Sequence, residues 1–556
     1  MALDVPKPLL LLLGATIQAI VFRSIWSHPF SQHSLMSIFA AFMALDVFAF
    51  SLHIVFIYPN FLSPIRHLPT PKGAVPILGH FLTGLKATRG EEYLKYSLET
   101  PNEGLIRLRG LFNSDQILVT SPKALAEILV NKPYDYPKPE RSREFLRTGL
   151  GDGLVVAEGE YHKFQRKYAT PSFSFRHVKD LYPLFWDKAL KMTKAIEDEI
   201  FGPQGTVTNI EGKLVGITDI ERWVPRATLD IIGIAGVGRD FNTLENSDDK
   251  MATLYATLFT PTLGTRMVAA SILVFGHRWT KVLLPSASRT IYNAVSAIRS
   301  LCGNFVREKR ERIKQGDDES VDVLASLIKA DVFSDHELVD ELLTILAAGH
   351  ETTSSTFTWI TYFLSRHPDI QSRLRAEVHD ALPIGFAPGK SPHSDVCAIL
   401  ESLPLLNGVC QETLRLFPPV PVTLRQNKKD NTLLGQPIAA HTLLTLAPWA
   451  TNNSPELWGP DAHEFKPERW IDPETGKPNQ TGGASTNYAF MTFLHGPRNC
   501  IGQQFARAEL RALLAAFICM YEWTRAEPEE EVIPAIVITV KPKDGLRLKL
   551  TKVRDW

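Results

Sequence analysis

Residues 35–58 form an apolar run, LMSIFAAFMALDVFAFSLHIVFIY, that is unsuited to a water-exposed surface. Asp46 and His53 are its only acidic or basic side chains. As an α-helix rising about 1.5 Å per residue, the run reaches roughly 36 Å, enough to cross the ~30 Å hydrocarbon core of a bilayer with some tilt. A helix buried in a protein core is the alternative. The run predicts a transmembrane helix, and the rest of the fold has to be arranged around it.

A shorter apolar run precedes it at residues 8–22. Its helical length of about 22 Å is marginal for a span, so it predicts either a second transmembrane helix or an interfacial segment. A cleaved signal peptide is disfavoured because no A-x-A-like site follows the run. Arg66, His67 and Lys72 come after the longer run and place the following domain on the cytosolic side.

Prolines mark the expected end of the anchor. Residues 58–73, YPNFLSPIRHLPTPKG, are too rich in proline to continue a helix. We therefore expect a membrane anchor of one or two transmembrane helices at 1–58, a proline-rich linker at 59–72 and a globular domain at 73–556. The 60 basic and 60 acidic residues balance, so no bulk charge favours nucleic acid, and no nucleic-acid partner is expected.

Five cysteines are too few and too scattered for a disulfide framework. They contain no CxxC pair, which fits a reducing compartment; they are Cys302, Cys397, Cys410, Cys500 and Cys519. Cys500 lies in a turn-rich segment, FLHGPRNCIG. From the residues alone it could be half of a disulfide, a nucleophile, an apolar filler or a metal ligand. A zinc site is disfavoured because no further zinc ligands cluster around it.

The helical pattern at 341–367 has an unusual centre. Ala347, Ala348 and Gly349 leave one face bare, and Glu351 and Thr352 follow. Glycine and threonine weaken a helix interior, and a threonine hydroxyl can bond back to the carbonyl four residues earlier. The pattern predicts a locally opened helix with a small pocket beside an acid and an alcohol, which could pass protons. A helix that packs closely through its small residues is an equal alternative.

A second helical pattern, QETLRLFPP, places Glu412 and Arg415 three residues apart on one turn. The helix is expected to end at Phe417, because Pro418 and Pro419 follow. Taken alone, the pair is typical of a surface ion pair.

Together these segments resemble the cytochrome P-450 family, and in style its fungal microsomal members. FLHGPRNCIG fits the heme-binding pattern F-x-x-G-x-R-x-C-x-G at each fixed position, AGHETT at 348–353 fits the oxygen-activation motif, and Glu412 and Arg415 fit the E-x-x-R pair. PERW at 467–470 supplies Arg469 as the third member of that pair's network. The resemblance covers residues 59–556.

The resemblance implies specific roles for these residues. Cys500 would be the axial thiolate ligand of a heme iron, a ligand that favours splitting of the O–O bond. Thr352 and Glu351 would deliver protons, and Glu412, Arg415 and Arg469 would form a structural network. The remaining expected cofactor contacts are Phe493, Gly496, Gly502, Arg498, His162, Arg166, Arg425 and His495. His162 stands where the family usually has tryptophan.

The family's known properties complete the expectation. The fold would be mainly α with a smaller β region, the cofactor heme b, and the electrons would come from NADPH through a flavin-containing cytochrome P-450 reductase, with cytochrome b5 as a second partner. The enzyme would be a monooxygenase in the endoplasmic reticulum membrane, acting on a lipophilic terpenoid or polyketide of fungal secondary metabolism. Fatty-acid or xenobiotic hydroxylation, and a reductase-independent isomerase or dehydratase, are the alternatives.

Two surfaces follow from the same resemblance. Arg507 and Arg511, four residues apart, could join Lys163 and Lys167 in a basic docking face for the reductase, although an ordinary solvated face is as good an interpretation.

The substrate pocket is expected to be lined by the loop at 141–154, the apolar stretch at 254–276, and residues 345–348 and 420–423. These segments are mostly aliphatic, which favours a lipophilic and largely neutral substrate.

Overall fold

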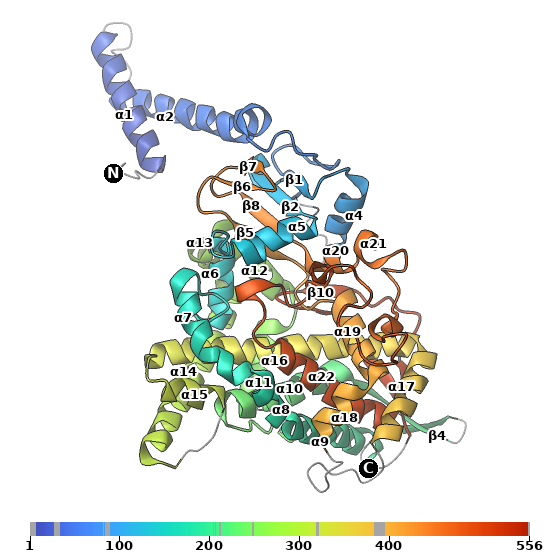
Figure 1. Cartoon of the computed structure of the whole chain (residues 1–556). Helices are drawn as coiled ribbons and strands as arrows, with labels where there is room; N and C mark the ends of the chain where they lie inside the picture. Colours follow the sequence, from blue (N-terminus) through green and yellow to red (C-terminus); the bar gives the residue numbers. More distant parts are fainter. Residues whose placement is uncertain are drawn as a thin grey trace.

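A computed structural model describes residues 7–26, 34–81, 83, 89–203, 205, 207–210, 213–246, 249–317, 322–382 and 395–553. In Figure 1 an extended helical arm, α1 and α2, leaves a mainly helical body that contains small sheets. The mainly α fold with a smaller β region is therefore confirmed. One helix in the described part of the chain, Leu35–Leu62, is long and apolar enough to cross a membrane.

That helix runs further than the prolines suggested. It consists of α2 (Leu35–Leu52) and the π-helix η1 (His53–Leu62), with Pro59 inside η1. Proline has no N–H to donate, and the wider turn of a π-helix can accommodate it where a regular α-helix would break. The expectation that no helix continues past residue 58 was wrong. The shorter helix α1 (Lys7–Ile25) packs against α2, and Gln18 Nε2 donates to Asp46 Oδ1 at 3.2 Å.

The end of η1 is bonded to the body of the protein. The Arg107 guanidinium donates to the Pro59 carbonyl at 2.5 Å, and Asn113 Nδ2 donates to the Val55 carbonyl at 2.9 Å. Arg107 belongs to strand β1 (Leu105–Arg109), and Asn113 to the short helix η2 (Leu111–Asn113). The anchor therefore continues into the sheet region without an extended linker over 59–62.

Two four-stranded sheets flank the helical body. One has the order β1–β2–β8–β5 and is antiparallel except for the parallel pair β2–β8; its remaining strands are β2 (Asp115–Val119), β8 (Leu443–Leu446) and β5 (Thr423–Gln426). The other is antiparallel with the order β3–β4–β12–β9: β3 (Val207–Ile210), β4 (Lys213–Asp219), β12 (Arg547–Lys552) and β9 (Tyr521–Arg525). Two hairpins complete the β structure, β6 (Asn431–Leu433) with β7 (Gln436–Ile438), and β10 (Pro534–Ile536) with β11 (Val540–Pro542).

The helices make up most of the body. Those before the long central helix are α4 (Glu91–Glu99), α5 (Pro122–Ala126), η3 (Glu127–Asn131), α6 (Glu140–Leu150), α7 (Gly159–Ala169), η4 (Thr170–Phe173), α8 (Phe175–Asp180), α9 (Tyr182–Phe201), α10 (Ile220–Val237), α11 (Lys250–Phe259), α12 (Leu263–Phe275), α13 (His277–Leu283), α14 (Pro285–Gln315) and α15 (Val323–Lys329). Those from it onward are α16 (Asp335–Arg366), α17 (Pro368–Ala381), α18 (Val396–Ser402), α19 (Pro404–Leu416), α20 (Pro448–Asn452), α21 (Pro455–Trp458), η5 (Pro467–Trp470), η6 (Asn487–Ala489), η7 (Gly496–Arg498) and α22 (Gln503–Met520).

Helix α16 crosses the body in Figure 1 and organises the core. A capping box starts it, in which Ser334 Oγ accepts from the backbone N–H of Glu337 while the Glu337 carboxylate accepts from the backbone N–H of Ser334. It ends at Arg366, just before the Pro368 that begins α17. Helices α10 and α22 pack against it, and most of its residues are buried. It therefore provides a rigid wall with one face toward Cys500 and another toward α10.

Candidate active site

The cysteine loop is held in place by backbone bonds. The Cys500 N–H donates to the Phe493 carbonyl at 2.9 Å, and the Asn499 N–H donates to the Gly496 carbonyl at 3.1 Å. Gly496 has φ +76°, and a Cβ there would lie 2.0 Å from the Leu129 carbonyl oxygen, so only glycine fits. Gly502 has an ordinary φ of −87°, so its place in the motif does not reflect backbone strain.

Cys500 is the exposed member of the five cysteines, and it opens into an internal cavity. Phe493, Arg498 and Gly502 line this cavity around it. Burial raises the pKa of the Cys500 thiol, whereas the backbone N–H of Gly502 and the positive charge of Arg166 act in the opposite direction. These are the surroundings in which a bound cation can stabilise the thiolate form.

Buried cations gather along one side of the cavity. Lys138, Arg425 and Arg498 all line it, and Glu158 is the carboxylate that faces them. Burial, together with the charges of Arg425 and Arg498, lowers the pKa of Lys138 well below its ordinary value. Burial and the Arg498 charge lower the pKa of Arg425 to about 9. More positive charge is buried here than one glutamate can balance.

His162 and Arg166 reach the same cavity from α7. Burial, followed by the Arg498 and Lys138 charges, lowers the pKa of His162 to about 4, so its ring is neutral at physiological pH. Arg166 donates to the Asn499 carbonyl at 2.6 Å and to Asn499 Oδ1 at 2.7 Å. Arg166 therefore fixes the residue beside Cys500 as well as facing the cavity.

These groups fit a heme. The Cys500 thiol can ligate iron, and the excess of buried cations can bind the two propionates. Arg498 supports this fit most directly, because its Nε has no hydrogen-bond partner among the described residues. Unpartnered buried donors cost free energy unless a ligand or water satisfies them.

Helix α16 forms the wall of the cavity opposite the cysteine loop. Thr344, Ile345, Ala348 and Thr352 line it, as expected for residues three or four apart. Thr352 Oγ1 donates to the Ala348 carbonyl at 2.9 Å, so the expected back-bonding is present. The helix nevertheless runs without a break through this region, and the expectation of a locally opened helix was wrong. The hydroxyl bond adds to the helical ladder and does not replace it.

Glu351 lies on another face of α16. It does not line the Cys500 cavity, and its buried carboxylate is bonded to Lys541 Nζ at 2.9 Å and to Thr539 Oγ1 at 2.7 Å. Successive helical residues point about 100° apart, which is why the acid and the alcohol of the motif face different sides. The expectation that both would face one pocket needs this correction.

Glu412, Arg415 and Arg469 meet in one buried network. The Arg415 guanidinium pairs with both carboxylate oxygens of Glu412 at 2.8 Å, and Arg469 Nε donates to Glu412 Oε1 at 2.9 Å. Trp470 Nε1 donates to Glu412 Oε2 at 2.9 Å. Glu412 and Arg415 are fully buried, so the interpretation as a surface ion pair was wrong.

Two further expectations are corrected by the positions of the side chains. His495 does not line the cavity; its Nε2 lies 3.1 Å from the Phe490 carbonyl, so it braces the cysteine loop from outside. Arg511 is buried and bonded to Glu401 at 2.6 Å and Asn407 at 2.5 Å, and Arg507 is also buried. The first turns of α22 face the core, so these two arginines do not form a basic docking face.

The lining of the cavity differs in part from the expected segments. Ile345, Ala348, Val420 and Thr423 line it as expected, and so does Leu154 from the expected segment 141–154. Most of that segment belongs to helix α6 (Glu140–Leu150), and none of the described lining residues comes from 254–276. Lys138, Glu158 and Glu341 were not foreseen. The Glu341 carboxylate accepts from the Leu154 N–H at 3.4 Å, and burial raises its pKa to about 7. No local motif marks these residues, because tertiary packing brings them together.

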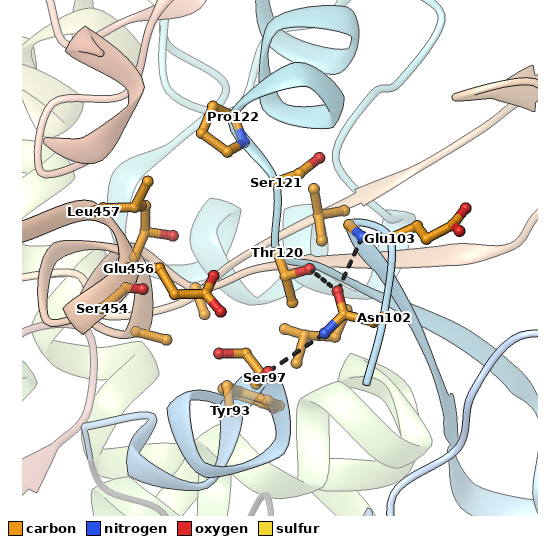
Figure 2. Close-up of a pocket in the computed structure, with 16 residues that line it drawn as sticks. Tyr93, Ser97, Asn102, Glu103, Thr120, Ser121, Pro122, Ser454, Glu456 and Leu457 are labelled. Carbon is orange, nitrogen blue, oxygen red and sulfur yellow. Dashed lines mark hydrogen bonds between the residues drawn. The ribbon is translucent and has the colours of Figure 1, made fainter. Parts of the chain in front are cut away.

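A separate polar hollow lies between α4, β2 and α21 (Figure 2). Asn102 is at its centre, accepting from Thr120 Oγ1 at 2.7 Å and donating to the Ser97 carbonyl at 3.3 Å. None of the motif residues lines it. Its central polar groups satisfy one another, so we do not place the active site there.

Comparison with known proteins shows the family of the chain. A model of the family described as Cytochrome P450 matches residues 69–549. Cytochrome P450 monooxygenase sphH of Aspergillus fumigatus is 40% identical over 91% of each chain, and cytochrome P450 monooxygenase FUM15 of Gibberella moniliformis is 36% identical over 91% of this chain and 92% of its own. The crystal structure of the cytochrome P450DA heme domain shares the fold, with a TM-score of 0.68 and 20% identity, over 88% of this chain and 98% of its own.

The fold and the cysteine-centred cavity are those of a heme-binding protein. The chain belongs to the cytochrome P450 family, and it is a monooxygenase of that family.

Proposed function

We propose that the protein inserts one atom of dioxygen into a lipophilic substrate, using electrons that a separate NADPH-dependent reductase supplies. The observation that carries this proposal is that the Cys500 thiol and the Thr352 hydroxyl face one cavity with cations along its side. When bound there, a thiolate-ligated heme supplies the activation of dioxygen.

The residues of the chain have distinct roles in this proposal. Cys500 holds the iron, and Lys138, Arg425 and Arg498 neutralise the propionates with neutral His162 as a further donor. Thr352 holds a proton at its Oγ1 on the side of the cavity opposite Cys500. Glu351 replaces that proton, and for this its carboxylate has to leave Lys541.

The substrate is proposed to be a terpenoid or polyketide of fungal secondary metabolism. Away from the cationic side the cavity is lined by aliphatic side chains, among them Val155, Ile232, Ile345 and Val420. Such a lining suits a lipophilic molecule. The fungal sources of the similar monooxygenases support the biological setting. Fatty-acid or xenobiotic hydroxylation is the second candidate, because the same lining would accept those molecules.

The proposed location is the endoplasmic reticulum membrane, with the catalytic domain in the cytosol. The apolar helix Leu35–Leu62 supports anchoring, and Arg66 and Lys72 follow it on the side of the catalytic domain. Cytochrome P-450 reductase is the proposed electron donor, with cytochrome b5 as a further partner.

The test starts with the absorption spectrum of the reduced, carbon-monoxide-bound protein. A strongly red-shifted Soret band that is lost in Cys500→Ser is expected. Turnover with reductase, NADPH and ¹⁸O₂ should then place one labelled atom in the product. Product formation without NADPH and without label would instead indicate an isomerase or dehydratase and overturn the proposal.

A further inference from the structure

A second cavity, of about 540 Å³, lies on the side of α16 that faces α10 and α11. Its mouth is formed by exposed residues, including Arg222 and Lys543, and its floor by buried His350, Glu351 and Tyr255. It has room for several water molecules, which need about 30 Å³ each in the liquid. Water can therefore reach the buried carboxylate of Glu351 from this side.

A buried carboxylate oxygen in this cavity, Glu221 Oε1, has no partner in the described part of the chain. Buried polar atoms are seldom left unsatisfied, and ordered water is the usual partner when protein offers none. The Glu221 carboxylate therefore indicates that the cavity holds water.

Two adjacent residues of α16 face different cavities. Glu351 faces this second cavity and Thr352 faces the Cys500 cavity. His350 Nδ1 lies 2.7 Å from the Leu346 carbonyl and therefore carries the proton, which leaves Nε2 as an acceptor 4.0 Å from Glu351 Oε2. Lys541 and Thr539 also bond to the Glu351 carboxylate. The cavity, the acid and the imidazole acceptor thus lie together on the side of α16 away from Thr352.

We infer that the second cavity is the route by which solvent protons reach Glu351, and that Glu221 is the positioning residue that relays them from the mouth. The inference rests on the proposed function and adds a residue and a path to it. In each cycle Glu221 gives a proton to cavity water and regains one from solvent, and Glu351 takes up a proton from that water. Per turnover two protons and two electrons reduce one oxygen atom of dioxygen to water, and the other atom enters the substrate.

The electrostatics of Glu221 suit this role. Burial raises its pKa to about 8, the charges of Asp219 and Glu351 add to the rise, and Lys541 opposes it. A group that titrates close to cytosolic pH exchanges protons most efficiently. The charged or titratable groups that line this cavity are Asp219, Glu221, Arg222, Arg226, Tyr255, His350, Glu351, Lys541, Lys543 and Asp544.

The experiment compares heme-loaded, full-length wild type with Glu221→Gln in lipid bilayers with reductase. The variant keeps the shape of the side chain but cannot carry a proton. We expect NADPH oxidation to slow about 10-fold, less than the 100-fold or more expected when a direct proton donor is removed, and its solvent deuterium isotope effect to rise. Glu99→Gln, an exposed glutamate on α4, is the matched control and should behave as wild type.

A readout independent of turnover is the infrared spectrum. The wild type should show a buried carboxyl band that titrates near pH 8 and is missing from Glu221→Gln. Unchanged NADPH oxidation and isotope effect in the variant would overturn the inference and leave the monooxygenase intact. The absence of such a band from the wild type would also overturn the inference. This measurement does not depend on whether the variant retains heme. Wild type without any NADPH-dependent oxidation would instead refute the proposed function.

Discussion

At the scale of single residues, the cations around the Cys500 cavity are the most informative feature. Lys138 is held in a place where burial and two arginines depress the pKa of its ammonium group. Such an arrangement stabilises an anionic ligand and costs stability without one. Removing one cation from this cluster therefore tests whether the cluster binds the heme propionates.

Lys138→Met is predicted to weaken heme retention by about 10-fold, which corresponds to one charge-assisted hydrogen bond. Heme loss to a scavenger protein measures this. In the heme-free protein, the depressed pKa means that stability rises with pH until the ordinary value near 10.5, because the unfolded chain binds the extra proton. The variant should lose that component of the pH dependence. Heme loss at the wild-type rate would contradict the prediction.

Glu412→Gln is predicted to prevent recovery of heme-loaded protein. The substitution leaves Arg415 and Arg469 without their shared anion in a buried site, at a cost of about 3–5 kcal/mol. Glu468→Gln, in the adjacent η5, is the matched control because its ion pair with Arg373 is exposed and contributes about 0–1 kcal/mol. The measurement is heme content per purified protein. Normal heme content in Glu412→Gln would show that the network is dispensable.

At the scale of elements, helix α10 packs closely on α16 because α16 has a glycine, Gly349, where the two helices touch. A Cβ on Gly349 would lie 2.6 Å from Ile232 Cγ1, a distance that real side chains do not adopt. Glycine costs helix stability at this position, and the close helix contact offsets that cost. The alternative of a helix packed through small residues is thus correct for Gly349, which also lines the cavity beside Ala348 and Thr352.

Gly349→Ala is predicted to destabilise the protein by about 1–3 kcal/mol through overpacking. Gly303→Ala on α14, where the nearest atoms to a new Cβ are 3.8 Å away, should instead stabilise by about 0.5–1 kcal/mol. Thermal unfolding of both variants measures the contrast. Combining Gly349→Ala with Ile232→Ala should recover part of the loss, and equal effects of the two glycine variants would contradict this account.

At the scale of the whole molecule, two apolar surfaces are exposed. One is the helix Leu35–Leu62, whose end is bonded to β1 and η2. The other lies on α12 and α13, where Leu263, Trp279 and Val282 are 75%, 64% and 69% exposed. Exposed apolar residues at this density indicate contact with a membrane or a partner.

A chain that begins at residue 63 is therefore predicted to retain weak binding to lipid vesicles. Adding Trp279→Ser and Val282→Ser should reduce that binding by about 10-fold or more, because each large apolar side chain contributes about 1.5–3 kcal/mol when buried. Vesicle flotation measures both effects. Phe175→Ser, an exposed aromatic residue on α8, is the control. Equal flotation of all truncated variants would show that α12 and α13 do not contact lipid.

The family, the cysteine motif and the apolar N-terminal helix could all be predicted from the sequence. Cys500, Thr352 and the Glu412–Arg415 pair lie in short local patterns, and a membrane helix is read from length and composition alone. Tertiary packing sets the side of α16 that Glu351 faces, and it brings Lys138 to the Cys500 cavity and Glu221 to the second cavity. It also places His495 outside the Cys500 cavity and buries Arg511. These outcomes depend on which helix face meets which neighbour. The burial and the electrostatic surroundings of these side chains are set by residues hundreds of positions away in the sequence, so no local pattern predicts them.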